Sequence, residues 1–181
     1  MKIGENEVEG LRYYPDAIDV EEEARILELC ASLQFSPITM RGVTARRTVV
    51  CFGYDYQYRS RSVVPVAPLP AALSELKSRC ASVASGPDSL DQVIVTRYPA
   101  GAGIGWHVDS PVFDDVIVGL SLAAPARLQM KLHGSSASLV LMPRSVYVLG
   151  GRARTVWQHR VPPLLHGTRY SITFRTVRPA R

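Results

Sequence analysis

The residues of this 181-residue chain that are best suited to chemistry are two histidines and one carboxylate. His107 and Asp109 are separated by a single residue, and His159 follows much later. Two imidazoles and one carboxylate on one face of a metal leave its other positions open, which suits ferrous iron that must also bind a co-substrate and dioxygen. If a strand carries His107 and Asp109, it directs both side chains inward. The three residues therefore predict an iron site.

A pair of arginines could hold an anion beside such a metal. Arg169 and Arg175 are an even number of positions apart, so a strand would direct both guanidinium groups to the same side. Arginine holds a carboxylate through two parallel hydrogen bonds. One arginine alone would be read as a surface charge, but two that flank a β-branched strand core are harder to leave in solvent. The pair therefore indicates a site for a dicarboxylate co-substrate.

Taken in order along the chain, these motifs resemble those of the AlkB family of Fe(II)- and 2-oxoglutarate-dependent dioxygenases. One His-x-Asp motif is weak evidence, whereas the ordered set of four is specific. The resemblance extends from residue 91 to residue 177, and a weaker one covers residues 47–54. The matched motifs are residues 96–99, 107–109, 159–163 and 169–175.

The resemblance implies a role for each matched residue. His107, Asp109 and His159 would bind Fe(II), with 2-oxoglutarate and dioxygen as co-substrates. Arg169 would pair with the distal carboxylate of 2-oxoglutarate, and Arg175 would lie near the carboxylate that also touches iron.

Three further residues would complete the co-substrate pocket by the same resemblance. Tyr98 would hydrogen-bond 2-oxoglutarate, and Ser171 would support it together with Thr96. The family often has asparagine at the positions of Thr96 and Ser171, whereas this chain has hydroxyl side chains at both.

Residues 35–62 mix arginines with aromatic side chains, including Arg46, Arg47 and Tyr54. Basic side chains can contact phosphates and aromatic rings can stack on unpaired bases. AlkB members use the matching region as a nucleotide lid, so we expect nucleic-acid contact there; the alternative is a β-hairpin with exposed arginines and an aromatic packing row. Trp106 would either wall the substrate pocket or fill the core.

The activity that the resemblance implies is oxidative demethylation of alkylated bases in DNA or RNA, such as N1-methyladenine and N3-methylcytosine, with release of formaldehyde. Repair members often carry an acidic residue two positions after the ligand aspartate, but this chain has Pro111, so Asp114 or Asp115 would have to substitute. One alternative is a tRNA-modifying hydroxylase that acts on a wobble-uridine substituent. An alternative of another class is a non-catalytic, nucleic-acid-binding jelly roll.

The remaining pattern predicts a single domain over residues 1–181, mostly β with flanking helices. Apolar residues at helical spacing predict helices over residues 20–33 and 71–84, the first capped by Asp19 in a capping box with Glu22. Residues 63–70 are proline-rich and should form an extended connector. This order predicts a double-stranded β-helix, or jelly roll, over about residues 90–178, with residues 35–62 as a lid-like segment. Strands are expected near residues 92–98, 116–122, 126–132, 138–142, 145–149, 155–161 and 170–177.

The composition indicates what kind of partner the protein has and where in the cell it is expected. A net charge of +5 and a pI near 9.3 favour a polyanionic partner. No apolar run is long enough to cross a bilayer and no secretory signal is visible, so a cytoplasmic protein is expected.

Cys30, Cys51 and Cys80 lack metal-ligand spacing and should be reduced core thiols. His133 and His166 are expected in a turn and a loop. No obligate protein partner is indicated, and we expect a monomer.

Overall fold

The structure is a computed structural model that describes residues 8–40, 42–57, 60, 62–84 and 90–178. A seven-stranded sheet has the order β1-β11-β8-β13-β6-β3-β2, a four-stranded sheet has the order β10-β9-β12-β7, and β4 pairs with β5. The elements of the first half are β1 Leu11–Tyr14, α1 Val20–Ser32, β2 Ser36–Met40, β3 Val43–Phe52, β4 Tyr54–Gln57, β5 Ser62–Pro65 and α2 Ser74–Ala84. Those of the second half are β6 Gln92–Pro99, β7 Ile104–His107, β8 Phe113–Leu122, β9 Ala126–Leu132, β10 Ser135–Leu141, β11 Ser145–Leu149, α3 Gly151–Thr155, β12 Gln158–Val161 and β13 Thr168–Val177.

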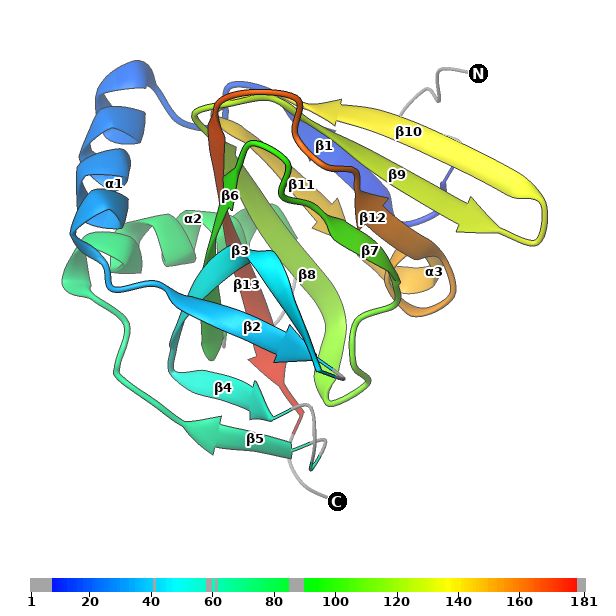
Figure 1. Cartoon of the computed structure of the whole chain (residues 1–181), viewed down its shortest axis with the longest axis horizontal. Helices are drawn as coiled ribbons and strands as arrows, with labels where there is room; N and C mark the ends of the chain where they lie inside the picture. Colours follow the sequence, from blue (N-terminus) through cyan, green and yellow to red (C-terminus); the bar gives the residue numbers. More distant parts are fainter. Residues whose placement is uncertain (1–7, 41, 58–59, 61, 85–89, 179–181) are drawn as a thin grey trace.

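The large sheet lies between the two long helices and the small sheet (Figure 1). Its outer face packs on α1 and α2 through one apolar cluster, in which Ile172 and Phe174 of β13 are fully buried. A second cluster joins its inner face to the small sheet, where Leu128 and Met130 of β9 contribute. Successive residues of a strand point to opposite faces. The expected jelly roll is confirmed, and its inner face is the one available for a site.

The two long helices form where the apolar spacing places them. Asp19 caps α1, because its side chain accepts a hydrogen bond of 2.7 Å from the Glu22 backbone N–H. The carboxylate of Glu22 pairs with Arg79 of α2, so it ties the two helices together. The second helix opens with a 3-10 turn over Ala71–Leu73 before α2 begins. None of the described helices is long and apolar enough to cross a membrane.

The strands expected over residues 116–122 and 138–142 each begin three residues earlier, at Phe113 and Ser135. Three other segments also differ from the sequence-based expectation. The strand expected from residue 155 begins only at residue 158, because the short helix α3 occupies the start of that segment. The connector expected over residues 63–70 begins as strand β5, paired with β4. One strand was expected to carry both His107 and Asp109. β7 ends at His107, so Asp109 lies beyond the strand.

The lid-like segment, residues 35–62, divides between two sheets. β2 and β3 form an antiparallel pair that extends the large sheet beside β6. Tyr54 and Tyr56 lie on β4, and the Tyr56 ring contacts Phe113 with centroids 5.9 Å apart. Four further residues of this segment fall outside the described part of the chain: Arg41, Tyr58, Arg59 and Arg61.

The three cysteines are free thiols, and burial raises the pKa of Cys30 to about 11 and that of Cys80 to about 12. Burial also raises the pKa of Cys51 to about 12, with the neighbouring Asp55 carboxylate adding to the shift. Because the thiolate is the nucleophile, iodoacetamide at pH 8 is expected to label the folded protein about 100-fold or more slowly than the urea-unfolded chain. Mass spectrometry of timed samples measures this, and rapid labelling of Cys30 would contradict its burial.

Candidate metal centre and co-substrate pocket

The structure brings His107, Asp109 and His159 together. Their potential ligand atoms all lie within 4.8 Å of one another. The antiparallel pairing of β7 and β12 places His107 directly opposite His159, with ring centroids 4.2 Å apart. The His159 Nε2 atom is 3.3 Å from Asp109 Oδ2. One strand pair therefore joins two motifs that are far apart in the sequence.

The protonation of His107 suits a metal ligand. Its Nδ1 lies 2.8 Å from the Gly105 carbonyl oxygen, which can only accept, so Nδ1 carries the proton and Nε2 keeps a free lone pair. Burial lowers the pKa of His107, and the neighbouring His159 lowers it further. Both effects favour the neutral imidazole, the form that binds a metal.

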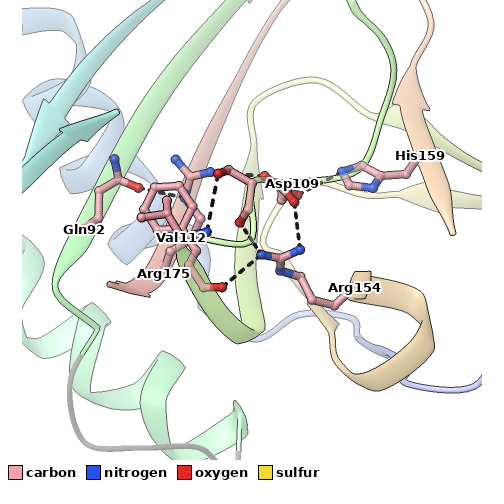
Figure 2. Close-up of polar contacts among 8 residues, drawn as sticks. Gln92, Asp109, Val112, Arg154, His159 and Arg175 are labelled. Carbon is pink, nitrogen blue, oxygen red and sulfur yellow. Dashed lines mark hydrogen bonds and ion pairs between the residues drawn. The ribbon is translucent and has the colours of Figure 1, made fainter. Parts of the chain in front are cut away.

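Asp109 lies in the loop after β7 and not on a strand, contrary to the sequence-based expectation. Arg175 of β13 donates from Nη1 to Asp109 Oδ1 at 3.1 Å. Arg175 is itself placed by Gln92, whose Oε1 accepts from its Nε at 2.8 Å, and its guanidinium stacks on Phe113 with Cζ 3.8 Å from the ring centroid. Figure 2 shows Arg175 and His159 approaching the Asp109 loop from different sides. The carboxylate is thus oriented by its neighbours and not by the strand alternation.

The backbone of the same loop is held by Arg154 of α3, whose exposed fraction is 3%. Its guanidinium donates to three carbonyls, those of Asp109 at 3.1 Å, Ser110 at 2.7 Å and Phe113 at 3.2 Å (Figure 2). A planar guanidinium has five N–H donors in a fixed geometry, so one side chain can hold several carbonyls at once. Arg154 therefore fixes the loop that presents Asp109.

Asp109 is kept ionised. Burial alone would raise its pKa, but the hydrogen bond with His159 and the charge of Arg175 outweigh that effect. The pKa of this carboxyl accordingly lies well below its usual range. One ionised carboxylate and two imidazoles meet the requirements of an Fe(II) site with open positions.

Arg169 occupies a second buried position on the same face of β13 and is only 1% exposed. Its Nε donates to Ser121 Oγ at 2.9 Å, and its Cζ lies 5.1 Å from the centroid of the Tyr98 ring. No carboxylate of the described residues forms an ion pair with it. A buried charge without a counter-ion is costly, so this position fits a carboxylate ligand such as the distal end of 2-oxoglutarate.

Hydroxyl side chains surround Arg169. The register of the large sheet places Ser171 beside Thr96 on one side and Ser121 on the other, and all three are buried. Tyr147 of β11 also reaches this pocket, where burial raises its pKa and the Arg169 charge opposes that shift. The neighbouring Ser171 side chain also opposes the effect of burial on the Tyr147 pKa. The pocket thus combines one fixed cation with several hydrogen-bonding groups.

Gly119 makes room for Tyr147. A Cβ at Gly119 would lie 2.2 Å from Tyr147 Cζ, which is too close for the ring to stay in place. Gly119→Ala is therefore expected to displace Tyr147 and raise the KM for 2-oxoglutarate about 10-fold or more, because overpacking disturbs the buried wall of the pocket. Steady-state succinate formation measures it. A KM for 2-oxoglutarate in Gly119→Ala equal to that of the wild type would contradict the role of Tyr147.

The expected substrate residues are placed differently from one another. Arg47 is 9% exposed, donates to the Gly103 carbonyl at 3.5 Å, and its charge contributes to the lowered pKa of His107. Arg46 is exposed and its guanidinium approaches Gly101. Tyr54 is half-buried on β4. The structure brings Arg47 close to the metal residues.

Trp106 lies elsewhere. Its ring contacts Lys131 and Arg160, with Lys131 Nζ 4.5 Å and Arg160 Cζ 4.6 Å from the ring centroid. Trp106 precedes His107 on β7, so the two side chains leave opposite faces of the strand. His133, with a φ of 43°, lies in the β9–β10 turn, and His166 lies in the loop before β13, as expected.

Sequence reasoning missed four residues of the site: Gln92, Ser121, Tyr147 and Arg154. Three of them, Gln92, Ser121 and Tyr147, could have been found, because each lies an even number of positions from an inward-pointing residue of the same strand. Ser121 lies between Leu120 and Leu122, and Tyr147 lies between Val146 and Val148, so each interrupts a run of aliphatic residues at such a position. Arg154 has no such signal, since a five-residue helix is too short to show a period.

Both a family model and named proteins match the sequence of this chain. A family model described as the 2OG-Fe(II) oxygenase superfamily matches residues 10–175. An Arabidopsis thaliana protein named alkylated DNA repair protein ALKBH8 homolog is 28% identical over 183 residues, covering 86% of this chain and 51% of that protein. A Mus musculus protein named tRNA (carboxymethyluridine(34)-5-O)-methyltransferase ALKBH8 is 31% identical over 168 residues, covering 85% of this chain and 24% of that protein. The chain thus spans about half the length of the first relative and a quarter of the second.

Solved structures show the same fold. OsALKBH1 superposes with a TM-score of 0.77 at 17% identity, covering 92% of this chain and 96% of that one. A prolyl hydroxylase from Trichoplax adhaerens, in complex with a hypoxia-inducible-factor peptide, gives a TM-score of 0.68 at 18% identity, with coverage of 93% and 83%. The family match spans nearly the whole chain, and the inner face presents the donors that this family needs. The chain therefore belongs to the 2OG-Fe(II) oxygenase superfamily as a dioxygenase of the AlkB family that uses Fe(II), 2-oxoglutarate and dioxygen.

Proposed function

We propose that this dioxygenase oxidises an alkyl group attached to a base of nucleic acid. The observation that carries the proposal is Arg47, a nearly buried cation beside the metal residues whose guanidinium has no ion-pair partner among the described side chains. A phosphate or a base carbonyl would satisfy its remaining donors. The exposed Arg46 beside it and the net charge of +5 add attraction for a polyanion.

The chain's own residues bind and orient the reactants. His107, Asp109 and His159 would hold Fe(II) and leave its other positions free. Arg169 would hold the distal carboxylate of 2-oxoglutarate against the Ser121 side of the pocket. When bound, Fe(II) and 2-oxoglutarate supply the oxidation of a substrate C–H bond by dioxygen, with the keto acid converted to succinate and carbon dioxide. A base in a duplex would have to leave the stack to reach this buried site.

The first candidate reaction is demethylation. Hydroxylation of a methyl group on a ring nitrogen of N1-methyladenine or N3-methylcytosine gives an unstable product that loses formaldehyde. The Arabidopsis relative is named alkylated DNA repair protein ALKBH8 homolog, and its reference to repair of alkylated DNA supports this candidate.

The second candidate is hydroxylation of a uridine substituent in tRNA, and two observations favour it. The mouse and Xenopus tropicalis relatives carry names that refer to a tRNA uridine. Pro111 stands where repair members often have an acidic residue to read an exocyclic amine, and Asp114 pairs with Arg178 at 3.5 Å. Uracil has no exocyclic amine, so it has less need of an acidic side chain at that position than adenine or cytosine.

One experiment separates these candidates. Methylated DNA and RNA oligonucleotides and tRNA with substituted wobble uridines are incubated with enzyme, Fe(II) and 2-oxoglutarate. Formaldehyde release with loss of a methyl mass supports the first candidate, and retention of an added oxygen supports the second. His107→Ala is the inactive control. If 2-oxoglutarate is decarboxylated but no nucleic acid changes mass, the nucleic-acid substrate is wrong; if it is not decarboxylated either, a non-catalytic binding module gains support.

A further inference from the structure

The outer face of the small sheet, which faces away from the metal residues, is basic. Along β9 and β12 the buried residues alternate with exposed or half-buried ones. His159 and Met130 point inward, so Arg160 and Lys131 point outward. We define the outer basic face by its four principal residues, Trp106, Arg127, Lys131 and Arg160.

Trp106 holds two cations in place on this face. Lys131 Nζ and Arg160 Cζ lie 4.5 Å and 4.6 Å from the centroid of its ring, within the range of a cation–π contact. Arg160 also donates from Nε to Gln129 Oε1 at 2.7 Å, and Arg127 donates from Nη1 to Ser138 Oγ at 3.2 Å. These partners are neutral, so they orient the cations without cancelling their charge.

The outer basic face lacks acidic residues. The four strands of the small sheet contain no aspartate or glutamate, and none of the three cations forms an ion pair with a described carboxylate. Elsewhere on the molecule, arginines such as Arg79, Arg144 and Arg152 do pair with carboxylates. Like charges held side by side repel, and an anion that binds between them removes that repulsion.

A hollow of about 650 Å³ adjoins this face at the end of the β9–β10 hairpin. Lys131 lines it and also lies over Trp106, so the two features are continuous. Its other polar walls come from His133, Ser136 and Gln158. The volume is within the range of small-molecule sites, and none of the lining residues is acidic. The combined surface therefore offers several donors and no competing carboxylate.

We propose that the outer basic face binds the sugar-phosphate backbone of the single-stranded nucleic acid whose target base lies at the metal, with a flanking nucleotide in the hollow. This rests on the proposed function above. Lysine, arginine, glutamine and serine are the side chains that contact phosphate and sugar, and tryptophan can stack on a base. An acidic peptide or an anionic membrane would use the charge but would have less use for the interleaved amides and hydroxyls.

The path from the metal to this face is short. β7 is the edge strand of the small sheet, and it carries His107 on the inner face and Trp106 on the outer face at consecutive positions. A strand of nucleic acid can therefore pass over the β7 edge without crossing the sheet. Contacts on the outer face would anchor the segment that flanks the target base and would add affinity without reading its sequence.

The first test measures binding of an unmodified, fluorescein-labelled RNA of about 15 nucleotides by anisotropy at several salt concentrations. Lys131→Ala with Arg160→Ala is expected to weaken binding about 10-fold or more and to reduce the slope of log K against log[salt] by about 1.4, the value for two lost single-strand phosphate contacts. The matched control, Arg25→Ala with Arg97→Ala, removes the same charge from exposed positions on α1 and β6 and should leave the slope unchanged. Equal effects of the two double variants, or no binding by the wild type, overturn the proposal.

A second measurement does not depend on the stability of the double variant. The chain has two tryptophans, so Trp157→Phe leaves Trp106 as the sole tryptophan fluorophore. RNA is expected to quench its emission, and unchanged emission at saturating RNA overturns the proposal. Sedimentation with vesicles of equal parts phosphatidylcholine and phosphatidylserine tests whether the outer basic face binds a membrane instead. If Lys131→Ala/Arg160→Ala loses vesicle binding but keeps RNA binding, the proposal is also overturned. If the wild type oxidises modified oligonucleotides while these tests fail, the proposed function stands and only the outer basic face is rejected.

Discussion

Replacing Arg169 with methionine is expected to raise the KM for 2-oxoglutarate about 100-fold or more, while the ligand-free protein stays at least as stable as the wild type. Two charge-assisted hydrogen bonds to a carboxylate, each worth about 1.5–3 kcal/mol, account for the loss of binding. The stability expectation has a separate cause. Arg169 is 1% exposed without a described carboxylate partner, and methionine fills similar space without a buried charge.

The two parts of this prediction have separate measurements. Succinate formation gives the KM, and the thermal unfolding midpoint with and without 2-oxoglutarate gives the stabilisation by the ligand. Arg97→Met is the matched control. Arg97 is exposed on the neighbouring strand β6, and its side chain points to the face of the large sheet opposite the co-substrate pocket. A 2-oxoglutarate-induced shift of the midpoint in Arg169→Met equal to that of the wild type would show that Arg169 is not the partner of the anion.

The sequence was informative where a strand imposes its own alternation. Arg169 and Arg175 lie on the same face of β13 because their spacing is even, and the pairing of β7 with β12 brings His107 to His159. The same alternation explains why a residue that is adjacent to the site in sequence can lie outside it in the structure. Trp106 is next to a metal residue along the chain, and for that reason it leaves the opposite face of β7.

The sequence was less informative where tertiary contacts decide the backbone. Asp109 reaches the metal cluster from a loop, and the side chains that hold it come from Arg154 and Arg175, which are more than 40 positions away. The start of β12 was placed too early, because a five-residue helix carries no measurable period and Arg154 is buried by contacts that only the fold creates. Neither a propensity nor a local pattern contains those contacts.

Arg154→Met is expected to lower the free energy of unfolding by about 3–5 kcal/mol and to weaken metal binding about 10- to 100-fold. Arg154 is 3% exposed, and its removal takes hydrogen bonds from the carbonyls of Asp109, Ser110 and Phe113. Carbonyls that stay buried without donors cost stability. The same carbonyls belong to the loop that presents Asp109, so the carboxylate loses its position relative to His107 and His159.

The neighbouring Arg152 provides the control for this prediction. It lies in the same short helix, its side chain is 55% exposed, and it pairs with Glu9 at 3.8 Å. Arg152→Met should therefore change stability by about 0.5 kcal/mol or less and leave metal affinity unaltered. Urea unfolding gives the stability, and titration with Fe(II) or Mn(II) at a temperature where both variants are folded gives the affinity. Because folded Arg154→Met retains all three ligand side chains, a metal affinity equal to that of the wild type would mean that the loop holds Asp109 in place without the Arg154 guanidinium.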